Sequence, residues 1–230
     1  MNNQIKAWAL VPVKGFKQAK SRLGSVLPAE QCAQLAINMA RDVIVALRNA
    51  ENVEGITILG DASEIEDLAR EFGCDHIADD QPADLSSNLT KAAQILTTDG
   101  VRTLIILPSD LPTLRGEDID ELLVAHQDGL TLCFAERDGG TNAMVITPPD
   151  AIQFRFGDRS GEHNLEAGRV AGLMCKKFTS PAFDHDIDIP ADLLWYCRQK
   201  ISGRTADYLG ESGIRARLLK AETPALAGYV

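Results

Sequence analysis

AWALVPVKGFKQAKSR, residues 7–22, joins a short apolar run to a loop rich in cations. The run is too short for a helix and is closed by Pro12 and Gly15, so it predicts a buried strand over residues 7–13. From residue 28 to residue 48 apolar side chains recur at helical spacing, and residues 54–59 read as a second strand. A strand, a helix and another strand in this order predict a parallel pair of strands.

The same alternation continues along the chain. Helical spacing predicts helices over residues 63–72, 88–96, 116–127, 164–172 and 190–200, and short apolar runs predict strands at residues 76–77, 103–107, 130–135 and 143–147. This order predicts an α/β fold, a single Rossmann-like domain with a mostly parallel mixed sheet. No repeat or linker divides residues 1–200, and residues 201–230 are expected to form a C-terminal tail or helical appendage.

Composition narrows the function classes. The formal charge of -10 and the pI near 4.9 argue against nucleic acid or an anionic membrane as the main partner, because such surfaces need clustered Lys and Arg. The apolar runs are far shorter than a membrane span, and the N-terminus lacks a basic signal-peptide region. The five cysteines are odd in number and widely spaced, which indicates buried cytosolic thiols. We expect an unprocessed cytoplasmic protein.

An open parallel sheet binds its ligands at the carboxyl ends of its strands, so the segments that follow the apolar runs are candidate sites. The loop from Lys14 to Arg22 holds four cations in an otherwise acidic chain. These cations suit a polyphosphate, although a solvated basic loop has the same composition. The loop does not match the Walker P-loop pattern.

Two acidic segments are candidates for a metal site. Asp110 follows an apolar strand and lies between two prolines, and a single carboxylate of this kind suits Mg²⁺, which completes its shell with water and phosphates. Asp184, Asp186 and Asp188 alternate and would share one face of an extended segment, where a cation would offset their repulsion. Alternatively, Asp110 caps the next turn or helix, and Asp188 caps a helix that begins at Pro190.

Two glycine-rich segments suit a small acid. Thr141 and Asn142 follow Gly139 and Gly140, and Ser160 lies in the segment FGDRSGEHN, residues 156–164. Glycines let backbone N–H groups approach an anion, and the hydroxyl and amide groups complete a pocket for an acid. A plain hairpin turn and a plain loop are the alternatives.

Taken in order, five segments resemble the guanylyltransferases of coenzyme F-420 biosynthesis, a family that acts on 2-phospho-L-lactate or phosphoenolpyruvate and includes 3-phosphoglycerate guanylyltransferases. The resemblance spans about residues 8–193. The segments that carry it are VPVKGFKQAKSRL, LPSDLPTL, GGTNAM, FGDRSGEHN and DIDIPADL.

The resemblance implies a nucleotidyltransferase fold and assigns roles to residues. The triphosphate of GTP would lie in the loop that contains Lys14, Gly15, Lys20 and Arg22, with Lys14, Lys20, Arg22 and Asp110 as catalytic residues. Mg²⁺ would bind Asp110 and Asp188, with Asp188 preferred to Asp186. Thr141, Gly157 and Ser160 would hold the three-carbon phospho-acid. A homodimer, and hand-off of the product to the next enzyme of the pathway, are further expectations.

The chain departs from this family in one place. Where the family commonly has a Gly-Leu-Asn turn near the nucleotide base, this chain has Ser86-Ser87-Asn88, and Asn88 is expected to serve as a helix N-cap or a base contact. The alternative functions are another nucleotidyltransferase, of molybdenum-cofactor or sugar-phosphate type, and a non-catalytic nucleotide-binding regulator. In the preferred reading a phosphate oxygen of the acid attacks the α-phosphorus of GTP and pyrophosphate leaves.

Overall fold

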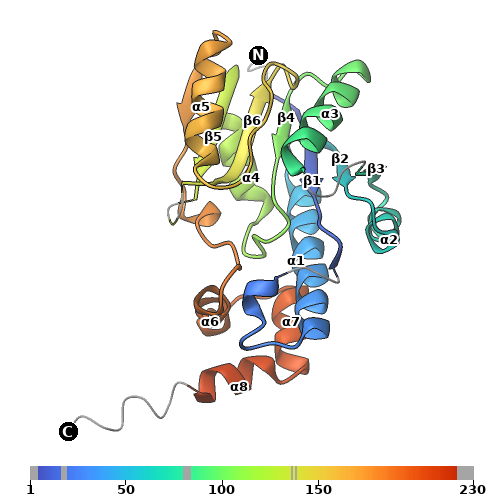
Figure 1. Cartoon of the computed structure of the whole chain (residues 1–230), viewed down its shortest axis with the longest axis vertical. Coiled ribbons are helices and arrows are strands. Elements are labelled where there is room, and N and C mark those ends of the chain that lie inside the picture. The colour runs from blue at the N-terminus through green and yellow to red at the C-terminus, as the bar shows by residue number, and fades with distance from the viewer. Residues whose placement is uncertain (1–4, 17–19, 80–83, 136, 138, 222–230) are drawn as a thin grey trace, which may run out of the picture.

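The computed structural model describes residues 5–16, 20–79, 84–135, 137 and 139–221, and Figure 1 shows their arrangement. Its seven-stranded sheet has the order β3-β2-β1-β4-β6-β5-β7. Neighbouring strands are parallel except where β6 pairs with β4 and β5, so the prediction of a mostly parallel mixed sheet is confirmed. The strands are β1 (Ala7–Pro12), β2 (Val53–Leu59), β3 (Asp75–Ile77), β4 (Leu104–Ile106), β5 (Gly129–Phe134), β6 (Thr141–Thr147) and β7 (Cys175–Lys177).

The predicted helices match the observed ones within a few residues. The sequence pattern gave no individual prediction for β7, α7 or α8. α3 begins three residues earlier than predicted because the Asp84 side chain caps it by accepting the N–H of Ser87 at 3.2 Å, so the expectation that Asn88 is the N-cap was wrong. The helices are α1 (Ala29–Asn49), α2 (Ser63–Phe72), α3 (Leu85–Thr98), α4 (Gly116–Ala125), α5 (Ser160–Val170), α6 (Pro190–Arg198), α7 (Arg204–Glu211) and α8 (Ile214–Ala221).

The sheet is buried on both faces, which explains its continuous apolar runs. In β4, Ile105 packs with the core that contains α1, α2 and α4, whereas Leu104 and Ile106 pack with the core that contains α3 and α5. Successive side chains of a strand point to opposite faces, so the short apolar run of β4 contributes side chains to both cores. None of the helices in the described part of the chain combines the length and apolar composition needed to cross a membrane.

The last two helices pack beneath the sheet against the lower half of α1 and beside α6 (Figure 1). Leu209 of α7 and Ile214 of α8 are buried in the same core as α1. The carboxylate of Asp42 on α1 accepts the backbone N–H groups of Arg204 and Thr205 at 2.8 and 2.9 Å, and so satisfies the first donors of α7. Within residues 201–221 the chain is therefore mostly helical.

One buried histidine lies at the far side of the sheet from the strands' carboxyl ends. His126, which is 1% exposed, contacts Thr131 Oγ1 through Nδ1 at 2.9 Å and Thr147 Oγ1 through Nε2 at 3.1 Å. Burial lowers the pKa of His126 to about 4, because the charged imidazolium would lose its hydration.

We expect this histidine to make stability fall in mild acid. The unfolded chain binds a proton at His126 below about pH 6.5, while the folded chain resists it until about pH 4, so its contribution is complete above pH 6.5 and is lost as the pH falls toward 4. The loss is at most about 3 kcal/mol. Urea unfolding of the wild type and of His126→Gln at pH 7 and pH 5 checks this: the wild type should lose more stability than the variant, and equal losses would contradict the assignment.

Candidate active site

A cavity of about 930 Å³ opens at the carboxyl ends of the central strands. It collects the predicted site residues from separate parts of the chain: Lys14, Lys20 and Arg22 after β1, Asp110 after β4, Thr141 and Asn142 of β6, Gly157 in the loop before α5, Ser160 at the start of α5, and Asp188 before α6. Gly15 lies between two lining residues, and Asn88 contacts a third, Asp79. Residues 17–19 of the cationic loop, Lys17 among them, lie outside the described residues.

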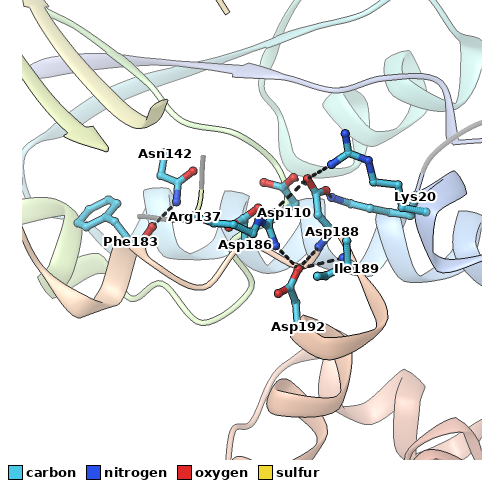
Figure 2. Close-up of polar contacts among 10 residues, drawn as sticks. Lys20, Asp110, Arg137, Asn142, Phe183, Asp186, Asp188, Ile189 and Asp192 are labelled. Carbon is cyan, nitrogen blue, oxygen red and sulfur yellow. Dashed lines mark hydrogen bonds and ion pairs between the residues drawn. The ribbon is translucent and has the colours of Figure 1, made fainter. Parts of the chain in front are cut away.

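The centre of the cavity is an ammonium group shared by two carboxylates. Lys20 Nζ donates to Asp110 Oδ2 at 2.7 Å and to Asp188 Oδ1 at 2.6 Å, and the Lys20 side chain is only 11% exposed (Figure 2). Arg22 approaches Asp188 from outside, at 3.8 Å. Lys20 has a left-handed backbone, with φ of 55°, which is costly for a residue with a Cβ and is found mainly where function constrains the chain.

A second cation, Arg137, contacts the acidic segment around Asp186 and Asp188 on the side away from Lys20. Arg137 donates to Asp186 at 2.9 Å and to Asp192 at 2.8 Å, and lies 3.7 Å from Asp188 (Figure 2). Asp192 in turn accepts the backbone N–H groups of Asp188 and Ile189, both at 2.9 Å. The cap of α6 is therefore supplied by Asp192, so the alternative reading of Asp188 as the cap was wrong.

Asp110 does not act as a helix cap either. The helix that follows it, α4, is capped at Arg115. The backbone carbonyl of Asp110 accepts the N–H of Ile187 at 3.0 Å, which joins the β4 loop to the acidic segment. Neither Asp110 nor Asp188 caps a helix, and both carboxylates line the cavity, where they are available to bind a cation.

Burial and charge act against each other in this cluster. Burial raises the pKa of the Asp188 carboxyl, but Lys20, Arg137 and Arg22 more than offset it, so this pKa lies below its usual range. Burial likewise opposes the charge on Lys20, yet Asp110 and Asp188 keep the Lys20 pKa above its ordinary value. Asp186 is different, since burial and then the charge of Asp110 raise its pKa to about 6. The cluster therefore still has an excess of negative charge, which favours an additional cation.

The carboxylates suit Mg²⁺ as ligands. No ready-made cluster of three or more His, Cys, Asp or Glu ligands occurs within the described residues, but Mg²⁺ is commonly held by only one or two carboxylates and by substrate phosphates. Asp110 Oδ1 is buried and has no hydrogen-bond partner among the described residues, an arrangement that a cation would satisfy. For both aspartates to bind a metal, Lys20 would have to release them.

The other end of the cavity is lined by hydroxyl groups. Thr141 Oγ1 and Ser160 Oγ lie 3.0 Å apart, and Ser160 opens α5. The N–H groups of Ser160 and Gly161 donate to the carbonyls of Gly157 and Gly139, both at 3.1 Å, so the side-chain hydroxyls are the polar groups offered here. Asn142 also lines this end, although its amide nitrogen donates to Phe183 O at 2.7 Å and so anchors the chain that leads into the acidic segment. Gly139 and Gly140 do form the turn of the β5–β6 hairpin, and the same turn forms part of the cavity.

Arg159 immediately precedes this helix and, like Lys20, has a left-handed backbone, with φ of 52°. These are the non-glycine residues of positive φ in the described part of the chain, and both adjoin the cavity. Gly161 packs against the ring of Phe134, and a Cβ there would lie 2.5 Å from ring atoms, so a larger residue would force the Phe134 ring to move.

Comparison with known proteins agrees with this geometry. The family model described as "Guanylyl transferase CofC like" matches residues 7–225. The chain belongs to this family of guanylyltransferases. It is 33% identical over 199 residues to a phosphoenolpyruvate guanylyltransferase of Roseiflexus castenholzii, a match that covers 86% of this chain and 90% of the relative. It is 31% identical over 218 residues to a 3-phospho-D-glycerate guanylyltransferase of Phenylobacterium zucineum, covering 92% and 99%.

Solved structures support the fold. A putative nucleotide-diphospho-sugar transferase from Desulfovibrio desulfuricans G20 superposes with a TM-score of 0.75 at 23% identity, over 93% of this chain and 97% of that one. A cytidylyltransferase from Leptospira borgpetersenii superposes with a TM-score of 0.57 at 13% identity, over 98% of each chain. The nucleotidyltransferase fold implied by the sequence resemblance is confirmed.

We expect Lys20→Met to destabilise the protein in the absence of metal, because Asp110 and Asp188 would lose their shared counter-ion. The cost should be about 1–3 kcal/mol, less than for a fully buried pair because the carboxylates are partly exposed. Millimolar Mg²⁺ should recover most of this loss, and should stabilise the variant more than the wild type.

Thermal unfolding with EDTA and with Mg²⁺ measures both effects. Lys14→Met removes an exposed lysine of the same loop and is the matched control, which should behave like the wild type. A Lys20→Met protein as stable as the wild type, with the same response to Mg²⁺, would contradict the counter-ion role.

Proposed function

We propose that the protein transfers GMP from GTP to the phosphate of a three-carbon phospho-acid, with Mg²⁺ as cofactor. The acceptor is phosphoenolpyruvate, 2-phospho-L-lactate or 3-phospho-D-glycerate, and the reaction is a step of coenzyme F-420 biosynthesis in the cytoplasm. The observation that carries the proposal is that one cavity brings together the cations after β1, the carboxylates of Asp110 and Asp188, and the hydroxyl groups of Thr141 and Ser160. The strands β1, β4 and β6, which lead to these groups, are successive neighbours in the sheet.

This order suits the two substrates. The cations compensate the charge of a triphosphate, and the hydroxyl groups of Thr141 and Ser160 near the start of α5 suit the phosphate or carboxylate of an acid. The relatives named above act on three-carbon phospho-acids according to their names, and this chain matches them over nearly its whole length. Homodimer formation and hand-off of the product belong to the proposal on the strength of the resemblance.

The chemistry follows from positioning and charge. A phosphate oxygen of the acid forms a bond to the α-phosphorus of GTP, the bond from that phosphorus to the bridging oxygen breaks, and pyrophosphate leaves in line. A phosphate monoester is largely ionised near neutral pH, so no side chain has to activate it. Bound Mg²⁺ supplies charge neutralisation at the phosphates. Lys14, Lys20 and Arg22 bind the triphosphate and stabilise the charge that develops on the leaving group.

The family match disfavours the alternatives of molybdenum-cofactor or sugar-phosphate type. A non-catalytic regulator is disfavoured by the carboxylate pair, because binding alone would not require two partly buried aspartates bridged by a lysine. Pyrophosphate release by the purified protein, measured for GTP, ATP, CTP and UTP against each of the three acids, separates these readings. Release with GTP and one acid is expected. Absence of release with all pairs in folded, GTP-binding protein would overturn the proposal.

Asp110→Asn should fold normally but lower turnover by at least about 100-fold, because an amide binds Mg²⁺ far more weakly than a carboxylate. Steady-state pyrophosphate release with GTP and the preferred acid checks this, with circular dichroism as the test of folding. Asp99→Asn, at an exposed position at the end of α3, is the matched control and should retain wild-type turnover. Near-normal activity in folded Asp110→Asn would rule out the metal role.

A further inference from the structure

One carboxylate of the cavity is not explained by the metal site or the acid site. Asp79 lines the cavity two residues after β3 and is half-buried. It lies beyond β1 as seen from the carboxylate pair, since the strand order from that edge is β3, β2, β1 and then β4. Leu85, which opens α3, lines the same end and offers apolar surface.

A buried side chain fixes the position of this carboxylate. Asn88 is 3% exposed and its amide Nδ2 donates to Asp79 Oδ1. Asn88 belongs to the first turn of α3, whose Asp84 cap fixes that turn in place. The turn is also joined to the acid end of the cavity, because Ser86 Oγ accepts the N–H of Phe156 at 2.9 Å. The first turn of α3 therefore holds Asp79 through Asn88, and is fixed relative to the acid end of the cavity through Ser86.

The spacing of the strands matches the length of a nucleotide. Two strand intervals, about 10 Å in total, separate β3 from β1. The cations after β1 are the phosphate-binding groups of the proposed function, so a base attached to those phosphates extends toward β3. The apolar side chain of Leu85 and the carboxylate of Asp79 lie at that end of the cavity.

A carboxylate there distinguishes purines by hydrogen bonding. An ionised carboxylate only accepts hydrogen bonds, and the Watson–Crick edge of guanine offers two adjacent donors, N1–H and the 2-amino group. Adenine presents an acceptor at N1 and has no 2-amino group, so it would meet the carboxylate with repulsion. Sites built on such complementary pairs reject the unmatched analogue strongly, since a polar group is left unpaired.

We propose that Asp79 is the residue that selects guanine, with Asn88 as the positioning residue that aims its carboxylate at N1–H and the 2-amino group. This inference rests on the proposed use of GTP. The resemblance suggested Asn88 as a base contact, but the structure directs its amide to Asp79.

The test exchanges the hydrogen-bonding pattern of protein and base together. In xanthine a carbonyl oxygen replaces the 2-amino group, so an asparagine amide at position 79 would match xanthine as the carboxylate matches guanine. We expect Asp79→Asn to lower kcat/KM for GTP by about 100-fold and to raise kcat/KM for XTP until XTP is the better substrate. Asp61→Asn, at an exposed position after β2, is the matched control and should keep the wild-type preference for GTP.

The wild type supplies a second measurement that does not depend on the folding of a variant. ITP lacks the 2-amino group, so the wild type should use it about 10-fold less efficiently than GTP. Folded Asp79→Asn that still prefers GTP to XTP, or a wild type that uses ITP as well as GTP, would overturn the role of Asp79. A wild type that uses no guanosine nucleotide at all would instead count against the proposed function.

Discussion

The site depends on one contact, the ammonium of Lys20 between the carboxylates of Asp110 and Asp188. Like charges this close are stable only with a cation between them, and the lysine supplies it from a strained left-handed backbone. The contact joins the β1 loop to the loops after β4 and before α6, three segments far apart in sequence. Since a divalent cation suits the same carboxylates, the lysine and the proposed Mg²⁺ would be alternative partners, and release of Lys20 would direct its charge to the triphosphate.

The remaining architecture places the other polar groups of the cavity on either side of this contact. Asp79 lies toward β3, and Thr141 and Ser160 lie toward β6 and α5, so in the proposed function the strand order would arrange base, phosphates and acid along one edge of the sheet. Arg137 and Asp192 fix the acidic segment in place: Arg137 donates to Asp192 and to Asp186. A parallel sheet brings the carboxyl ends of its strands to one edge, and that geometry makes a three-part site possible.

Local signals made much of this predictable. Short apolar runs and helical spacing indicated the sheet and most helices, and the polar residues that follow those runs indicated most of the cavity. The ion pair of Arg137 with Asp192, and the contact of Asn88 with Asp79, could not be predicted, because they join residues that only tertiary packing brings together. β7 was missed because Cys175–Lys177 has almost no apolar pattern at the sheet edge. The cap of α3 was misplaced because Asp84, Ser87 and Asn88 are all capping residue types.

A crystal structure with Mn²⁺ and a GTP analogue that cannot release pyrophosphate tests the central claim most directly, because anomalous scattering locates the metal without reference to activity. The account predicts a metal peak within bonding distance of Asp110 and Asp188, with Lys20 moved from between them onto the phosphates. A metal bound elsewhere, with Lys20 still bridging the two carboxylates in the presence of nucleotide, would contradict it.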